Sequence, residues 1–241
     1  MTVLTLRSKQ EIEQARRMLR WQGLSCEPQG VEGLLGRMGV RSAAALGAWL
    51  KSWDVQKTAE FASKNIQIEQ PLLDIGAYAS EILCVLNRMG FAHLNGIDLN
   101  PDLVGAARKL GFECRVGDFH DSGYPDGLFR AVTAISVIEH GFRETDLFRE
   151  VSRILAPGGY FVASFDYWPD KLDTSDVDLF GMDWRIFSRE EVHSLLKTAE
   201  GYGLSPVGKV DLDAVAPVIH WEGRSYTFAW MALRKKGGFA A

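Results

Sequence analysis

The sequence lacks the features typical of membrane, disulfide-rich and nucleic-acid-binding proteins. No apolar run approaches the ~20 residues that span a bilayer, and the first eight residues hold no apolar core long enough for a signal peptide. The three cysteines, Cys26, Cys84 and Cys114, have no Cys-x-x-Cys spacing, which favours buried thiols over disulfides or a zinc site. A net charge of -4 without a long Lys/Arg block argues against nucleic-acid binding. We therefore expect a cytoplasmic protein without nucleic-acid or membrane partners.

Helical patterns dominate the first 65 residues, and nothing there alternates like a strand. Ser8 and Glu11 have the spacing of a capping box at the start of a helix. Residues 42–64 predict two more helices. We interpret residues 1–65 as a helical cap or lid in front of a main domain, residues 66–241.

Strand and helix patterns alternate from Pro71 onward. The predicted strands are 72–75, 94–98, 112–116, 131–136 and 160–165; the predicted helices are 80–89, 101–110, 145–155 and 188–199; a closing strand hairpin is predicted from 207–212 and 225–233. Such alternation predicts a parallel sheet covered by helices on both faces. Ligands bind to such sheets at the carboxyl ends of the strands.

Acidic residues follow three consecutive predicted strands. Asp74 precedes the small residues Gly76 and Ala77, which allow a ligand to approach the backbone closely. Asp98 lies 22 residues after Gly76, a position suited to the hydroxyls of a ribose. A single aspartate after a strand is commonly only a turn or helix cap. The successive intervals of 24 and 20 residues that lead to Asp118 favour a purine-nucleoside site instead.

Six segments together resemble the class I S-adenosylmethionine-dependent methyltransferases, in that family's order. They are LDIG (73–76), GIDLNP (96–101), VGD (116–118), SVIEH (136–140), ILAPGG (154–159) and FSREE (187–191). The resemblance covers about residues 71–235. It implies a Rossmann-like, doubly wound α/β fold whose sheet has seven mostly parallel strands and an antiparallel last strand. It also implies S-adenosylmethionine as the cofactor.

The resemblance assigns roles to individual residues at the strand ends. Asp98 would hold the ribose hydroxyls, and Asp118 would meet the adenine amino group. Ser136 and Val137 would pass under the sulfonium through their backbone. The complete implied set of cofactor-binding residues is Asp74, Gly76, Ala77, Tyr78, Asp98, Leu99, Gly117, Asp118, Phe119, Ser136 and Val137.

The turn after the first strand departs from the family pattern. The family usually has Gly-x-Gly-x-Gly where this sequence has Gly76-Ala77-Tyr78-Ala79-Ser80. Either Tyr78 covers the ligand as a lid, or the pocket is degenerate. The two carboxylates for ribose and adenine favour the lid.

Two histidines are the candidate general bases. His140 follows the fourth predicted strand, and its alternative is a solvent-facing residue at a helix start. His220 lies beside Trp221 in a predicted loop, and its alternative is a turn residue next to a core tryptophan.

The connection from residue 166 to residue 185 is long enough to form a lid or a substrate wall. Its candidate substrate contacts are Asp166, Tyr167, Trp168 and Trp184. The many aspartates of this connection have no metal-ligand register, so no metal is expected.

We interpret the chain as a methyltransferase acting on a small molecule, with a hydroxyl oxygen favoured over nitrogen or carbon as the acceptor. The SVIE segment does not match the Asn/Asp-Pro-Pro-aromatic pattern typical of base methylation in nucleic acids. A nicotinamide dehydrogenase would need glycines at Tyr78 and Glu81. A cofactor-bound enzyme of another reaction, a non-catalytic methyltransferase-like subunit and a homodimer all stay open.

Overall fold

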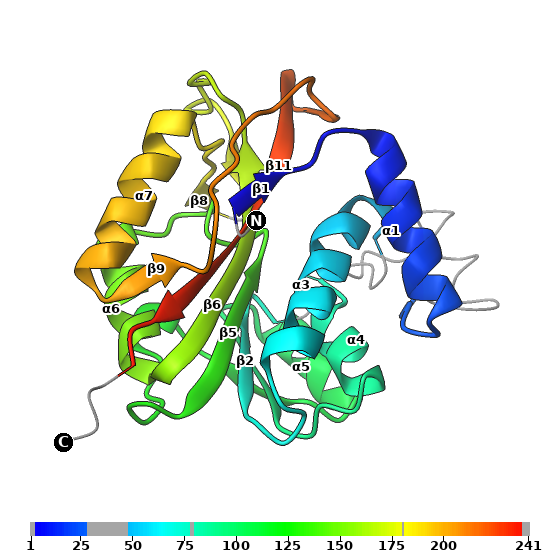
Figure 1. Ribbon diagram of the computed structural model, residues 1–241, viewed down its shortest axis with the longest axis vertical. Coiled ribbons are helices and arrows are strands. Elements are labelled where there is room, and N and C mark those ends of the chain that lie inside the picture. The colour runs from blue at the N-terminus through cyan, green and yellow to red at the C-terminus, as the bar shows by residue number, and fades with distance from the viewer. Residues whose placement is uncertain (1–2, 28–47, 78–79, 180, 238–241) are drawn as a thin grey trace.

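A nine-stranded sheet forms the centre of the computed structural model, which describes residues 3–27, 48–77, 80–179 and 181–237 (Figure 1). Its strands are β1 (Val3–Thr5), β2 (Leu72–Ile75), β3 (Leu94–Asp98), β4 (Glu113–Val116), β5 (Phe129–Ile135), β6 (Leu155–Tyr167), β9 (Leu204–Pro206), β10 (Ile219–Trp221) and β11 (Arg224–Lys235). The order β1-β11-β6-β5-β2-β3-β4 has β9 and β10 paired with β11. A separate two-stranded ribbon joins β7 (Asp178–Leu179) to β8 (Met182–Asp183).

Strands β2 to β6 are parallel, and β11 runs antiparallel to β6. This confirms the predicted doubly wound, mostly parallel sheet with an antiparallel last strand. The order of the strands reverses at β2, which has β3 on one side and β5 on the other. The carboxyl ends of these three strands therefore meet at one edge, where open α/β sheets bind ligands.

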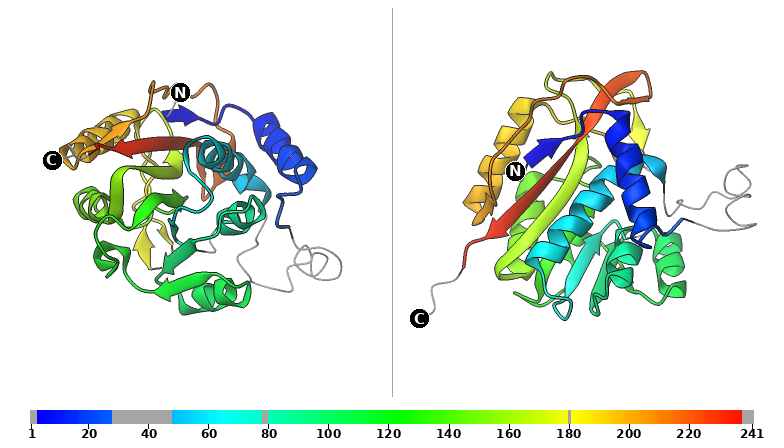
Figure 2. Two further views of the ribbon diagram at one scale, coloured as in Figure 1. Left: turned by 60° about the horizontal axis from the view of Figure 1, so that its bottom comes forward. Right: turned by 45° about the vertical axis from the view of Figure 1, so that its right-hand side comes forward.

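Helices cover both faces of the sheet (Figures 1 and 2). They are α1 (Lys9–Trp21), α3 (Ser52–Asn65), α4 (Ile82–Arg88), α5 (Pro101–Lys109), α6 (Glu144–Ile154) and α7 (Arg189–Gly201), with the short 3-10 helices η1 (Trp49–Lys51) and η2 (Phe119–Asp121). Helices α1, α3, α4 and α5 share one apolar cluster, and α6 and α7 share another. No helix in the described ranges is long and apolar enough to cross a bilayer.

Successive strand residues face opposite clusters, as the pleat of a strand requires. In β2, Leu72 packs on the α3 side and Leu73 on the α6 side. The same alternation in β6 puts Phe165 on the α6 side, so its neighbours Ser164 and Asp166 point towards α3. The polar residues of the strand ends therefore face the N-terminal helices.

The N-terminal region contributes a strand that the helical prediction missed. Residues Val3–Thr5 form β1, which pairs antiparallel with residues 229–231 of β11. Three residues are too few to show alternation, and the pairing partner lies more than 200 positions away. Helix α1 begins as predicted, with the Ser8 side chain accepting from the backbone N–H of Glu11. The two helices predicted within residues 42–64 cover 42–53 and 54–64. Helix α3 contains the second, and residues 42–47 of the first lie outside the described residues.

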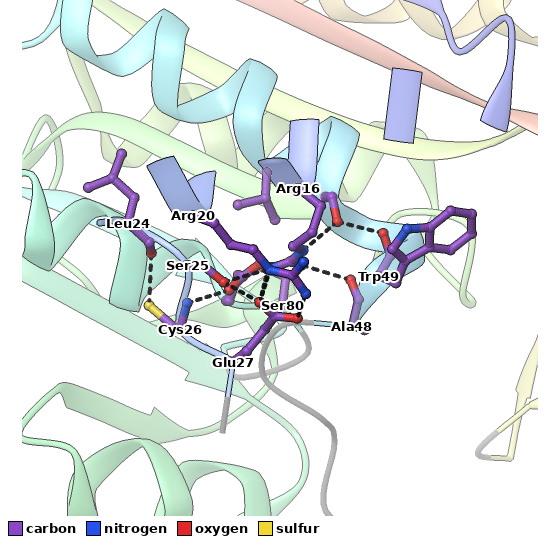
Figure 3. Close-up of polar contacts among 12 residues, drawn as sticks. Arg16, Arg20, Leu24, Ser25, Cys26, Glu27, Ala48, Trp49 and Ser80 are labelled. Carbon is purple, nitrogen blue, oxygen red and sulfur yellow. Dashed lines mark hydrogen bonds and ion pairs between the residues drawn. The ribbon is translucent and has the colours of Figure 1, made fainter. Parts of the chain in front are cut away.

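A buried ion pair fastens α1 to the turn after β2. The Arg16 side chain is 2% exposed, and its guanidinium lies 2.6 Å from the carboxylate of Glu81. Arg16 also donates to Ser25 Oγ and to the carbonyl of Ala48, as Figure 3 shows. A further hydrogen bond from Arg16 goes to Ser52 Oγ. These partners satisfy a charge whose burial is otherwise costly. The N-terminal helices are thus bound to the edge of the sheet where the strand order reverses. The division of the chain into two domains at residue 65 is a proposal.

The prediction of a strand at residues 207–212 is wrong. The structure has β9 before it and β10 after it, and Val210 makes only one isolated bridge, with Val3. The edge of β11 that this segment needs is already paired with β1 beside residues 229–231 and with β9 beside residues 233–235. Strand β6 is longer than predicted, because it continues through Pro157 and the two glycines that follow.

Gly96 provides a test of the close packing beneath the ligand edge. A Cβ at this position would lie 2.5 Å from Ala77 Cβ and 2.6 Å from Cys114 Sγ. We expect Gly96→Ala to lower the free energy of unfolding by about 1–3 kcal/mol through overpacking. The control is Gly105→Ala in α5, where no atom lies within 4 Å, and it should raise stability by about 0.5–1 kcal/mol. Urea unfolding measures both changes, and equal effects would contradict the packing argument.

Candidate functional site

Asp98 ends β3 at the edge where the strand order reverses. Its carboxylate accepts a 2.7 Å hydrogen bond from the backbone N–H of Asn100, and partial burial raises its pKa. Leu99 beside it is 60% exposed. An acidic group and an exposed apolar side chain thus lie together, as binding of a ribose and its attached base requires.

Asp74 lies deeper in β2 than a direct ligand contact would need. It is 1% exposed, and its Oδ1 accepts a 2.5 Å hydrogen bond from Thr133 Oγ1 on β5. Burial raises the pKa of Asp74 to about 7, and the nearby charge of Asp98 adds to this effect. The carboxyl therefore joins β2 to β5 beneath the ligand edge.

The backbone bends sharply where β2 and β5 end. Gly76 has φ of +71°, and a Cβ there would lie 2.5 Å from Val137 Cγ2. Ser136 has φ of 51°, an uncommon and strained value for a residue other than glycine. Ala77 is fully buried in the α3-side core, which removes its side chain from direct ligand contact. Tyr78, the candidate lid residue, lies outside the described residues.

The segment after β4 fits its predicted role only in part. Asp118 has a 60% exposed side chain, but it caps η2 by accepting a 2.8 Å hydrogen bond from the N–H of His120. Phe119 is a core residue that is 3% exposed on the α6 side, so its ring does not line an open pocket. Gly117 joins the ends of β3 and β4 through its N–H, which donates to the carbonyl of Asp98.

These features fit an adenosyl cofactor. Asp98 offers a carboxylate for the ribose hydroxyls. Gly76 has no side chain that would keep a ligand away from its backbone. Ser136 presents a bent strand end beside it. The fit is weakest at the adenine, where Asp118 is already engaged with His120.

Comparison with known proteins gives the same family. The sequence profile of the methyltransferase-domain family matches residues 73–163. The sterol 24-C-methyltransferase ERG6B of Gibberella zeae is 27% identical over 143 residues, which is 54% of this chain and 38% of that protein. The ubiquinone biosynthesis O-methyltransferase of Xanthomonas oryzae pv. oryzae is 35% identical over 95 residues, 36% of this chain and 39% of that protein. The chain thus spans about two fifths of these relatives.

Solved structures agree on the fold. The [4+2]-cyclase SpnF has a TM-score of 0.62 at 17% identity, covering 93% of this chain and 97% of that one. The geranyl diphosphate C-methyltransferase from Streptomyces coelicolor A3(2) has a TM-score of 0.60 at 19% identity, with 89% and 87% covered. The chain has the fold of the class I S-adenosylmethionine-dependent methyltransferases, and its residues 73–163 match the methyltransferase-domain family. Its cofactor is S-adenosylmethionine.

The predicted substrate residues separate onto two faces of the sheet. Asp166 is 6% exposed on the α3 side, where Trp184 Nε1 donates to it at 2.8 Å. Trp168 is partly buried on the same side. Tyr167, the next residue along β6, points to the α6 side and donates its hydroxyl to the carbonyl of Leu212. The pleat of the strand thus excludes Tyr167 from the set.

The two candidate histidines also differ in position. His140 follows β5, is half-buried and bridges to Trp184. Burial, and secondarily the charge of Lys51, lower the pKa of His140 to about 4, so it is neutral at pH 7. His220 is exposed in β10 rather than in a loop, where its Nδ1 lies 2.9 Å from Ser225 Oγ. The ring of its neighbour Trp221 has its centroid 5.0 Å from that of Trp184.

Three charged residues at this edge were not among the predicted site residues. Lys51, the last residue of η1, donates from Nζ to Ser136 Oγ and lies 4.3 Å from the ring centroid of Phe228. Asp54 in α3 is fully buried and accepts a 2.9 Å hydrogen bond from Ser164 Oγ. Glu139 is 2% exposed. Glu139 lies within the SVIEH segment, whereas Lys51 and Asp54 belong to the region interpreted as a lid.

The described ranges contain no group of three or more His, Cys, Asp or Glu side chains that could hold a metal ion. The side chains at the strand ends instead interact with each other and with one lysine.

Asp74 gives the site a testable pH dependence. Its folded pKa of about 7 exceeds the ordinary value of 3.8, so the folded state binds its proton more tightly than the unfolded state. The destabilisation from Asp74 therefore grows as pH rises from about 4 to about 7, by at most about 1.4 kcal/mol per pH unit. Relative to Asp74→Asn, the wild type should lose stability over this window in urea unfolding. A constant difference from pH 4 to 8 would contradict the burial of an ionisable carboxyl here.

Proposed function

We propose that the protein transfers a methyl group from S-adenosylmethionine to a small molecule, at a hydroxyl oxygen. The observation that carries this proposal is the Asp98 carboxylate at the end of β3, next to the bent backbone of Gly76 and Ser136. This arrangement suits a ribose on one side and a reacting methyl group on the other.

When bound, S-adenosylmethionine supplies a methyl group already activated by its sulfonium. The protein therefore acts mainly by positioning, which contributes to rate by holding the reactants in line. Asp98 orients the ribose, and the backbone at Ser136 and Val137 borders the reacting end. An acceptor hydroxyl also has to lose its proton, and the titratable groups Glu139 and His140 follow Ser136 and Val137 in the same turn after β5.

Two curated relatives support oxygen as the acceptor atom. One is the ubiquinone biosynthesis O-methyltransferase described above. The other is the fatty-acid O-methyltransferase of Mycolicibacterium smegmatis, 38% identical over 76 residues, 30% of this chain and 27% of that protein. Two other relatives are named for different acceptor atoms. The sterol 24-C-methyltransferase is named for carbon, and the phosphoethanolamine N-methyltransferase 1 of Arabidopsis thaliana for nitrogen. The proposal of an oxygen acceptor consequently depends on the residues of the site as much as on the relatives.

We place the protein in the cytoplasm, acting on a free small molecule without nucleic acid. Its three cysteines are unpaired in the structure, which suits a reducing compartment. A homodimer is also compatible with the sequence. The alternatives are a cofactor-bound enzyme of another reaction and a non-catalytic subunit. Release of S-adenosylhomocysteine in the presence of acceptor separates methyl transfer from both.

Asp98 tests the cofactor site. Asp98→Ala should weaken binding of S-adenosylmethionine at least about 100-fold, because it removes charge-assisted hydrogen bonds to the ribose. Titration calorimetry measures the affinity, and circular dichroism checks that the fold persists. Asp126→Ala is the control, since it removes a carboxylate from an exposed ion pair with Arg153. Unchanged affinity in Asp98→Ala, or absence of heat with the wild type at millimolar cofactor, would refute the assignment.

His140 tests the acceptor side. His140→Ala should lower turnover about 100-fold while cofactor affinity changes little, because His140 lies beyond the strand end that borders the methyl group. His193→Ala on the exposed side of α7 is the matched control. Turnover is followed as S-adenosylhomocysteine formed, and cofactor affinity by calorimetry. Equal turnover of the two variants would remove His140 from the reaction.

A further inference from the structure

Four charged side chains converge on the α3 side of the strand ends. Lys51 comes from η1, Asp54 from α3, Glu139 from the turn after β5 and Asp166 from the end of β6. The charge of Lys51 acts on all three carboxyls and opposes the effect of their burial, which raises the pKa of Asp54 and of Asp166 to about 6. One cation is therefore shared by three buried acids.

Two of these carboxyls have fixed partners within the protein. Asp54 accepts from Ser164 Oγ and from the backbone N–H of Val55. Asp166 accepts from Trp184 Nε1. Hydrogen bonds of this kind satisfy buried carboxylates and hold them in one orientation. Both residues thus support the site without needing a ligand.

Glu139 differs from the other two acids. Its side chain is 98% buried, yet Oε2 has no hydrogen-bond partner in the part of the chain that the structure describes. Burial and the negative charge of Asp166 raise its pKa well above the ordinary value. A buried polar oxygen without a partner is costly, so its retention points to a ligand that completes it.

Lys51 lies beside the position proposed for the methyl acceptor. Its ammonium donates to Ser136 Oγ at the strained end of β5 and lies over the ring of Phe228. Ser136 is the residue that borders the reacting methyl group in the proposed function. The ammonium is consequently next to the position of the attacking atom.

We propose that Lys51 and Glu139 form the acceptor site, and that this site takes a molecule with an ionisable hydroxyl, such as a phenol, bound as its oxyanion. Lys51 pairs with the oxyanion, and Glu139 receives the hydroxyl proton. The inference rests on the proposed function and names its substrate class. Asp54 and Asp166 are positioning residues, because they act through Lys51 and Trp184.

The proton and electron balance is simple. Glu139, as carboxylate, takes the hydroxyl proton, and the resulting oxyanion is stabilised by the Lys51 ammonium. The oxygen forms a bond to the methyl carbon while the carbon–sulfur bond breaks and its electron pair stays on sulfur. The proton on Glu139 then leaves to solvent. No oxidant, reductant or metal takes part.

The position of Lys51 favours oxygen over a protonated amine. An acceptor that is itself an ammonium would meet the like charge of Lys51 beside Ser136. It also has no lone pair with which to attack. An oxyanion meets an opposite charge instead, and an opposite charge within about 4–6 Å lowers the pKa of an acid by about 1–3 units.

The test uses 4-nitrophenol, whose phenolate has its own absorption band. The wild-type protein, with and without S-adenosylhomocysteine, should bind it as phenolate and lower its pKa by about one unit or more. Lys51→Met should abolish this shift, and Lys51→Arg should retain it because the charge remains. Lys57→Met, which alters a partly exposed lysine of α3, is the control and should behave as the wild type. Glu139→Gln should retain phenolate binding, since it removes only the proton acceptor.

A wild type that leaves the pKa of 4-nitrophenol unchanged would overturn the proposal, and so would a Lys51→Met variant with the wild-type shift. Because Lys51→Met could disturb folding, the pair Lys51→Arg and Lys51→Met is compared at equal helical content by circular dichroism. If the arginine variant also loses the shift while folded, a charge-pairing role is excluded. Calorimetry with S-adenosylmethionine on the same samples reports separately on the proposed function, because Lys51 variants should keep wild-type cofactor affinity.

Discussion

The position of β2 between β3 and β5 determines where the functional side chains lie. The reversal of strand order at β2 brings three carboxyl ends to one edge, and Asp98, Gly76 and Ser136 lie at those ends. The hydrogen bond from Thr133 to Asp74 joins the two strands on either side of the reversal just below that edge. The topology of the sheet therefore brings these groups together at one edge.

Burial of ionisable groups is the cost of this arrangement. Asp74, Asp54, Glu139 and Asp166 all have raised pKa values, chiefly because they are removed from water. Marginally stable proteins retain such groups mainly where the groups have a function, since apolar replacements would stabilise the fold. Three of the four interact with Lys51, and this group is the one proposed to bind the acceptor and take its proton.

The sequence predicted the sheet better than it predicted the site. Strands β2 and β3 were predicted at their observed bounds, because short apolar runs ending in Asp and Gly are local signals. Strand β1 was missed, since only its pairing with β11 makes it a strand. Phe119 and Tyr167 were placed on the wrong side because a local pattern does not fix which face of the sheet a side chain occupies. Lys51 carries no local signal, since its role depends on contacts with residues 85 and 177 positions away.

The contribution of Lys51 and Asp54 changes how the N-terminal region is understood. A lid that only covers a pocket needs apolar surface towards the domain and polar surface towards solvent. Helix α3 instead buries an aspartate that reaches Ser164 on β6, and η1 delivers a cation to Ser136 on the strand end. The Arg16–Glu81 pair ties the same region to the turn that borders the cofactor. Because both halves of the site depend on the N-terminal helices, displacement of these helices would disrupt the acceptor site and the cofactor turn together.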